Sequence, residues 1–323
     1  SFYEALIERD LESVPAAVRT FRESHSSDDL FLAVARFAVL AWAPSQHAKH
    51  ALLCCLAAHD LREELGDRFD DALTECAIYA AQSRPPWSEP PITHPPETGP
   101  GHDGSIGELR AAVAALDRLR GERWLAGRHR DRGLAADYFA VASEDFEDLG
   151  HKLIVSTAAW RLAERLGEQG RYATLRIGVW EMTSYRGPAH EERGCALEAR
   201  ALLDRLIAHV IDQEGSPIAS HALFLFDAAI EAADIAGDAS IERRVRDHLT
   251  AAVPAPVTAS TPPAAGEDVP LYRFARDYGQ CFKSHAVAKR LAARFPDADV
   301  RAITAATRHH LEHAPSFEEW SFA

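Results

Sequence analysis

The sequence predicts an all-α protein, a single large helical domain of about a dozen helices interrupted by two Pro-rich loops. Three observations support this fold class. Apolar residues recur three and four positions apart over long stretches, alanine is abundant, and alternating apolar and polar runs rich in β-branched residues are nearly absent. We therefore expect helices throughout the chain and no significant sheet.

The helical period is clearest over residues 30–41 and 197–210, where each stretch presents one apolar face. Small polar residues that can cap free backbone amides predict where helices begin, and glycines predict where they end. The predicted starts are Ser45, Ser105, Ser216 and Asp238, and the predicted ends are Gly66, Gly167, Gly187 and Gly237.

Two Pro-rich stretches, residues 85–104 and 253–270, should be extended loops because proline disfavours a helical residue before it. They divide the chain into helical blocks at 1–84, 105–252 and 271–323. We treat residues 1–323 as one all-α domain. Repeats with matching landmarks are absent, so the pattern does not support a helical-repeat array.

Composition narrows the class of protein and its partners. The 323 residues are 47% hydrophobic and 26% charged, and no apolar run approaches the ~20 residues that span a bilayer. The beginning of the chain lacks a basic region followed by an apolar core, and five cysteines form no CxxC pair, so we expect a cytoplasmic protein without a membrane partner. A net charge of -14 without a dense Lys/Arg run disfavours nucleic acid.

The first candidate site is the segment Gln46–His50, which opens a predicted helix. His47 and His50 lie about one turn apart and can share a metal ion; the alternative is a solvated, polar first turn. The later pair His59-Asp60 resembles the HD pair of metal-dependent phosphohydrolases. We disfavour that interpretation because His59 points away from His50 on the same helix.

His151 and His221 each stand at the head of an apolar stripe, so both are expected to face the interior. A core histidine held by one hydrogen bond is the alternative for each alone. Lys283 aligns with Val287 on another apolar stripe, where a lysine is costly unless it is neutralised, paired or modified. His285 aligns with Ala288 and Ala292 on a neighbouring face of the same predicted helix.

Four segments in order resemble the questin oxidase-like family of helical enzymes that oxidise polyketide-derived aromatic rings. They are Gln46–Leu52, His151–Ile154, His221–Leu223 and Gln280–Lys283. The resemblance implies that a mononuclear Fe(II), in the metal-dependent branch, is held by His47, His151, His221 and a carboxylated Lys283. The second histidine of the family's mid-chain motif is replaced here by Ala158, and the histidine of its His-x-x-Lys motif by Gln280. His50 and His285 are candidates to complete the site. The predicted catalytic residues are His47, His151, His221, Lys283 and His285.

We therefore expect an O2-dependent oxidoreductase of secondary metabolism, a Baeyer–Villiger-type or ring-cleaving enzyme acting on a small aromatic substrate. No flavin or nicotinamide motif is present. The resemblance implies either Fe(II) or no cofactor, in which case an ionised phenol substrate reacts with O2 directly while the histidines act as bases. Two alternatives stay open. One is a non-catalytic helical binding or scaffold protein whose histidines are core residues, and the other is a hydrolase or lyase on the same scaffold.

Overall fold

The computed structural model describes residues 1–42, 46–83, 95, 103–256, 274 and 279–313, without the side chains of residues 46 and 47. These residues form helices joined by loops and contain no strand, so the predicted all-α fold class is confirmed. The α-helices are α1 (Phe2–Glu8), α2 (Val14–Arg22), α3 (Ser27–Leu40), α4 (Gln46–Asp60), α5 (Arg62–Leu65), α6 (Phe69–Ser83), α7 (Ile106–Ala115), α8 (Arg118–Arg128), α9 (Leu134–Ala142), α10 (His151–Met182), α11 (Ala199–Asp212), α12 (Pro217–Ala236), α13 (Ala239–Ala252), α14 (Gln280–Arg294) and α15 (Arg301–His313). Two 3-10 helices, η1 (Gly66–Arg68) and η2 (Asp148–Gly150), complete the set.

Helix starts agree with the capping residues that the sequence indicates. The Ser105 hydroxyl accepts a hydrogen bond from the backbone N–H of Glu108 at the start of α7, and Asp238 caps α13 through Ser240. Ser216 precedes α12 as predicted, but its hydroxyl makes no capping hydrogen bond, and the first residue of α12 is a proline. Such caps satisfy backbone donors that the helix itself leaves free. The expected start at Ser45 lies outside the described residues.

Glycines end helices at three of the predicted places. Gly66 follows α5 with a positive φ of 52°, Gly237 follows α12 in the left-handed conformation, and Gly167, with φ 69° and ψ -171°, ends the first half of α10. Gly187 differs from the prediction, because it lies in the loop beyond α10, which ends at Met182. A single glycine is therefore an incomplete stop signal.

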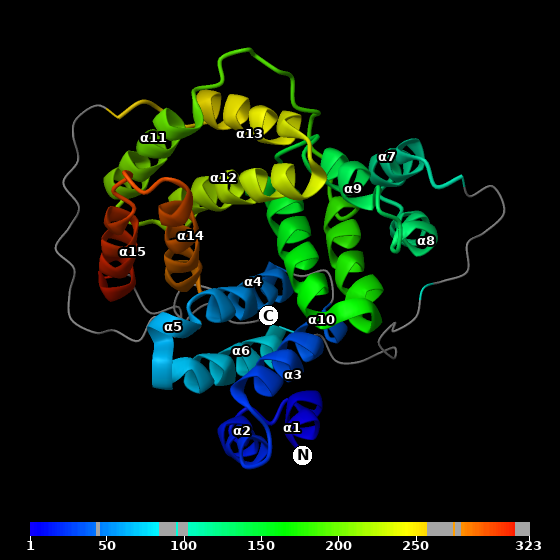
Figure 1. Cartoon of the computed structure of the whole chain (residues 1–323), viewed down its shortest axis with the longest axis vertical. Helices are drawn as coiled ribbons and strands as arrows, with labels where there is room; N and C mark the ends of the chain where they lie inside the picture. The colour runs from blue at the N-terminus through cyan, green and yellow to red at the C-terminus, as the bar shows by residue number, and fades with distance from the viewer. Residues whose placement is uncertain (43–45, 84–94, 96–102, 257–273, 275–278, 314–323) are drawn as a thin grey trace.

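The turn at Gly167 makes α10 a helical hairpin, and Figure 1 shows its two halves side by side. A Cβ on Gly178 in the second half would come within 1.8 Å of the Tyr138 hydroxyl of α9 and within 2.8 Å of the Ser156 hydroxyl in the first half. The absence of a side chain at Gly178 therefore lets the two halves approach closely. Most of the Pro-rich loops at 85–104 and 253–270 lies outside the described residues.

Two buried apolar regions, which we call the first and second cores, share α10 and α14. The first core is built mainly from α1–α4 and α6, and the second from α7–α9, α11–α13 and α15. Val155 of α10 and Phe282 of α14 face the first core, while Leu153 and Leu291 face the second. Each fully buried residue of this size contributes roughly 1.5–3 kcal/mol. The boundary between the two cores is therefore defined by α10 and α14 together with α4 and α12, which pack against them.

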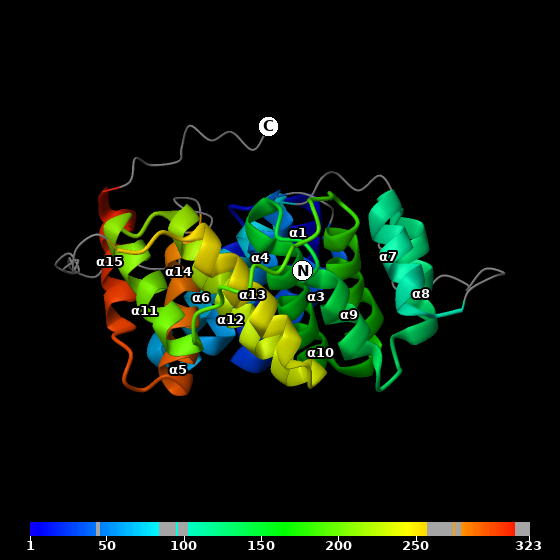
Figure 2. The same ribbon diagram turned by 90° about the horizontal axis from the view of Figure 1, so that it is seen from above.

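Figure 2 shows that the molecule is flattened, with α7 and α8 at one edge and α11 and α15 at the other. None of the helices in the described part of the chain combines the length and apolar character needed to cross a bilayer.

Candidate metal centre

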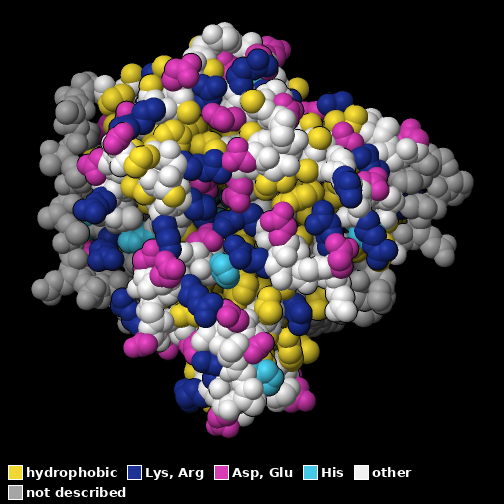
Figure 3. Space-filling view, viewed as in Figure 1, with side chains coloured by type: hydrophobic (Ala, Val, Ile, Leu, Met, Phe, Trp, Pro, Cys, Tyr) yellow, Lys and Arg dark blue, Asp and Glu magenta, His cyan; other side chains and the backbone are white. Residues whose placement is uncertain are grey.

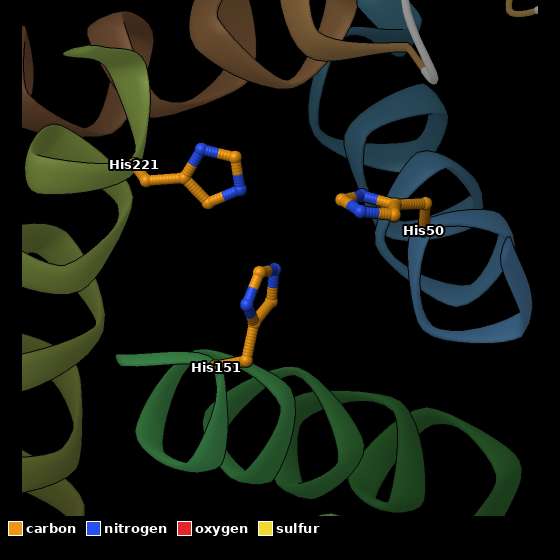
Figure 4. Close-up of side chains that lie close together, drawn as sticks. All are labelled: His50, His151 and His221. Carbon is orange, nitrogen blue, oxygen red and sulfur yellow. The ribbon is translucent and has the colours of Figure 1, made fainter. Parts of the chain in front are cut away.

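Three histidines meet at the boundary between the two cores. His50 comes from α4, His151 from α10 and His221 from α12, and one ring nitrogen of each lies within 4.8 Å of the others. All three side chains are buried, and Figure 4 shows their rings pointing toward one another. We call these three residues the histidine cluster. Among the described residues, this is where potential metal ligands converge in a group of three or more.

The cluster lies at the beginning of each helix that contributes to it. His151 is the first residue of α10, whereas His50 and His221 lie in the second turn of their helices. Lys283 lies in the first turn of α14, and its Nζ is 2.6 Å from His50 Nδ1. Helix N-termini carry partial positive charge, so four of them around one point favour an anionic group and neutral imidazoles there.

Backbone carbonyls fix the tautomers of two cluster histidines. His151 Nδ1 lies 2.5 Å from the carbonyl oxygen of Asp148, and His221 Nδ1 lies 2.7 Å from that of Pro217. A carbonyl oxygen can only accept, so each Nδ1 donates its proton and each Nε2 presents a lone pair. This is the arrangement that orients metal-binding histidines.

His151 Nε2 gives the clearest test of whether the site suits a metal ion. The side chain is only 4% exposed, and Nε2 has no hydrogen-bond partner among the described residues. A buried polar atom without a partner costs roughly 1–3 kcal/mol. Because this atom is a lone-pair donor beside two other imidazoles, the residues present fit a divalent metal ion.

The segment that precedes His151 has an unusual backbone. Asp148, Leu149 and Gly150 have consecutive positive φ values of 49°, 59° and 79°. The left-handed region costs a residue with a side chain about 1–2 kcal/mol, and such strain is concentrated at functional sites. Here the turn places the carbonyl of Asp148 against His151 Nδ1. The strained turn therefore fixes the orientation of the His151 ring.

A buried lysine completes the surroundings of His151. Lys49 Nζ donates to Asp148 Oδ2 at 2.6 Å and to Glu181 Oε1 at 3.2 Å. Although burial raises the pKa of Asp148, hydrogen bonds from His151 and Lys49 hold it below its usual range. Asp148 is therefore an anion, and its Oδ2 lies 3.3 Å from His151 Nδ1.

Two of the cluster imidazoles, those of His50 and His221, are held in the neutral form by their surroundings. Burial holds the pKa of His50 well below its usual value, and the neighbouring Lys283 lowers it further. Burial also lowers the pKa of His221 to about 3, with His151 as the next contributor. Neutral imidazole is the form that binds metal ions. Lys283 is buried as well, with Nζ 5.7 Å from the centre of the Phe224 ring.

The structure brings together three of the residues singled out from the sequence, His151, His221 and Lys283. The fourth participant is His50, one of the two candidates to complete the site. The side chain of His47 lies outside the described residues. His285 lies apart from the cluster against α15, where the backbone of Thr304 and the side chain of Arg308 are its neighbours.

Other residues were missed from the sequence. Asp148 orients the His151 ring through its carbonyl, and Lys49 donates a hydrogen bond to the Asp148 carboxylate. Only the short Asp-Leu-Gly turn before a buried histidine could have indicated the role of Asp148. His59 packs against the ring of Phe31, whereas Asp60 forms ion pairs with two arginines. The HD pair therefore takes no part in the histidine cluster.

Comparison of the chain with models of known families, with curated proteins and with solved structures finds no significant match. The resemblance to the questin oxidase-like family is tested by none of these comparisons and stays a prediction.

Proposed function

We propose that the histidine cluster holds one divalent metal ion and that the protein is an oxidoreductase using O2. The observation that carries this proposal is the convergence of His50, His151 and His221 within 4.8 Å, together with the buried, unpartnered Nε2 of His151. Iron is the metal that the sequence resemblance implies. Bound Fe(II) would supply the one-electron chemistry that O2 requires.

Each neighbouring residue has a definite task in this proposal. The carbonyls of Asp148 and Pro217 hold the Nδ1 protons of His151 and His221, so that both Nε2 lone pairs face the cluster. The Asp148 carboxylate strengthens the first of these histidines as a donor, and Lys49 keeps that carboxylate ionised.

Lys283 is proposed as an anionic ligand in its carboxylated form. Its neutral amine, which lies 2.6 Å from His50 Nδ1, would add to the carbon of CO2 and release one proton to solvent, so that His50 stays neutral and can bind the metal ion. The carbamate supplies the negative charge that a cation needs among neutral imidazoles and four helix N-termini. An oxygen ligand of this kind suits a hard metal ion.

The proposed substrate is a small aromatic, polyketide-like compound with an ionisable hydroxyl group. A phenolate would be stabilised by the same helix N-termini that favour anions at the cluster. Oxidation or cleavage of the ring with O2 is the reaction class that the sequence resemblance implies.

The test is O2 consumption by protein loaded anaerobically with Fe(II), measured with a panel of polyhydroxylated aromatic compounds. We expect turnover that disappears in His151→Ala and persists in His285→Ala, the matched substitution outside the cluster. Failure of Fe(II)-loaded wild-type protein to consume O2 with any compound would overturn the oxidoreductase proposal.

A second candidate function is a zinc hydrolase or lyase in the same site. Three imidazoles are the protein ligands of one well-known class of catalytic zinc centre, which is the specific observation that favours it. Turnover in the absence of O2 with Zn(II)-loaded protein would identify this function. A non-catalytic binding protein would bind no metal and keep its stability in the presence of a chelator.

A further inference from the structure

The four helices around the histidine cluster meet a second time, in a set of charged residues that we call the ion-pair layer. It consists of Asp60 of α4, Arg161 of α10, Asp227 and Glu231 of α12, and Arg290 of α14. Arg161 contacts Asp60 at 2.7 Å and Glu231 at 3.0 Å, and Arg290 contacts Asp227 at 2.6 Å and also Asp60. The layer therefore links all four helices, and it sets three carboxylates against two guanidinium groups.

The residues between the two layers repeat one spacing in all four helices. Each helix contributes a first residue near the cluster and further residues three, four and seven positions later, a spacing that falls on one helical face. The first residues are Leu53 of α4, Ile154 of α10, Phe224 of α12 and Lys283 of α14. Seven residues of helix span about 10 Å. Four such faces therefore enclose a common space about 10 Å long.

This space is a cavity that opens to solvent. All the residues in the repeated spacing line it except Asp60. Its volume is about 470 Å³ with the part open to solvent included, which falls within the roughly 300–1,000 Å³ of small-molecule sites. One small side chain from each helix keeps the middle of the wall open, namely Ala57, Ala158, Ala228 and Ala286. The cavity can therefore admit an organic molecule.

The mouth of the cavity lies near the ion-pair layer. The side chains of Glu231 and Arg290 are 22% and 25% exposed, whereas Lys283 at the other end is buried. Figure 3 shows side chains of both charges gathered near the centre of one face, where α4, α10, α12 and α14 meet in Figure 1. A ligand would enter past these charged groups.

The inner end of the cavity lies against the histidine cluster. Lys283 lines this end with Nζ 2.6 Å from His50 Nδ1, and the ring centres of Phe224 and His221 are 5.5 Å apart. Four helix N-termini favour negative charge there, and the amine of Lys283 or a metal ion in the cluster would add to this preference. The inner end therefore suits an anionic oxygen.

Between its two ends, the cavity is mainly apolar. Leu56 and Val287 line it together with the four alanines, and Phe224 contributes an aromatic ring. Burial of apolar surface and contact with this ring would both stabilise a flat aromatic body.

The outer end has an excess of negative charge. Asp60 contacts both arginines of the layer, and Asp227 contacts Arg290. Among the described residues, Glu231 is paired with Arg161 alone. Burial raises the pKa of Glu231, because its charged form is poorly hydrated there. A hydroxyl group that donates to this carboxylate would stabilise the charge, so the outer end suits a hydrogen-bond donor.

We propose that this cavity binds the substrate of the metal centre, an aromatic compound with hydroxyl groups at opposite ends. One hydroxyl group, in its ionised form, lies beside Lys283 and the cluster. The other donates to Glu231, about 10 Å away along the helices. The inference rests on the proposed function for the aromatic body and its oxidation. Binding itself requires no O2, so it can be measured separately from turnover.

The test is calorimetric titration under argon of the full-length chain, metal-free and treated with Zn(II), with 2,6-dihydroxynaphthalene and with 2-naphthol, which lacks the second hydroxyl group. We expect the wild-type protein to bind both compounds and the dihydroxy compound more tightly. Ala158→Leu and the milder Ala228→Val narrow the cavity and should weaken binding of both compounds roughly tenfold. Ala222→Val, a matched change on α12 outside the wall, should leave both affinities unchanged.

Glu231→Gln tests the outer end. It should weaken binding of 2,6-dihydroxynaphthalene about fivefold and leave 2-naphthol nearly unaffected, because a hydrogen bond to a carboxylate is stronger than one to an amide. Asp234→Asn, the same kind of change at an exposed position on α12, should affect neither compound. Equal changes for the two compounds in Glu231→Gln would overturn the role of Glu231.

The remaining outcomes separate this proposal from the proposed function. Wild-type protein that binds neither compound, or folded Ala158→Leu and Ala228→Val that bind both as tightly as the wild type, would overturn the cavity proposal. Binding with the expected variant effects in a protein that takes up no metal would refute the proposed function alone. Metal uptake and O2 consumption that persist unchanged in both folded variants would refute the cavity proposal alone.

Discussion

His285 offers a direct test of whether burial lowers the pKa of a histidine in this chain. Burial lowers its pKa from the ordinary 6.5 to about 4, with Arg308 as the next contributor. As the pH falls, the unfolded chain therefore binds a proton at this residue before the folded chain does. The stabilisation is full above pH 6.5 and is lost between pH 6.5 and 4. From these two pKa values, we expect a loss of about 2 kcal/mol at pH 5.

The substitution that tests this is His285→Asn, which keeps a donor for the Thr304 carbonyl and cannot become charged. The free energy of unfolding is measured by urea denaturation at pH 7 and pH 5. Its decrease between the two pH values should be about 2 kcal/mol smaller in the variant than in the wild-type protein. His25→Asn, at an exposed position, should leave the decrease unchanged. Equal decreases in wild-type protein and His285→Asn would refute the reasoning.

Three further predictions concern the metal centre and the backbone. Asp148→Asn should weaken metal binding about tenfold in a chelator competition, because it removes the carboxylate 3.3 Å from His151 Nδ1, whereas the surface change Asp131→Asn should not. Added bicarbonate should tighten metal binding by the wild-type protein and have no effect on Lys283→Met; an equal response in both would exclude the carbamate. Gly215→Ala should cost at least 2 kcal/mol in urea denaturation, because its φ is 75° and a Cβ would lie 2.1 Å from a backbone oxygen of α15. Gly237→Ala, where φ is 65° and the space is open, should cost only about 1 kcal/mol, and equal costs would contradict this explanation.

Much of the fold follows from local sequence patterns. The all-α class, the cap at Ser105 and the glycine end at Gly237 depend on neighbouring residues alone and were predicted correctly. The interior position of His151 and His221 also followed, because each heads an apolar stripe that must pack against another helix.

Other features depend on contacts between distant segments and could not be predicted. His47 and His50 lie about one turn apart, and only the packing of α4 against α10 and α14 brings His50 to the cluster. Asp148 has a positive φ although it is not a glycine, so its residue type does not indicate this conformation. The pairing of Asp60 with Arg161 joins residues far apart in the chain, and the cavity between the layers arises from four helices at once.

The central proposal is a metal centre made by the histidine cluster, and metal content tests it most directly. The protein is purified without chelator, loaded with Fe(II) or Zn(II), freed of excess metal and submitted to elemental analysis. We expect about one metal ion per chain in wild-type protein and in His285→Ala, and loss of that ion in His50→Ala, His151→Ala and His221→Ala. Wild-type protein that retains neither metal, or folded cluster variants that retain as much as the wild type, would contradict the proposed centre.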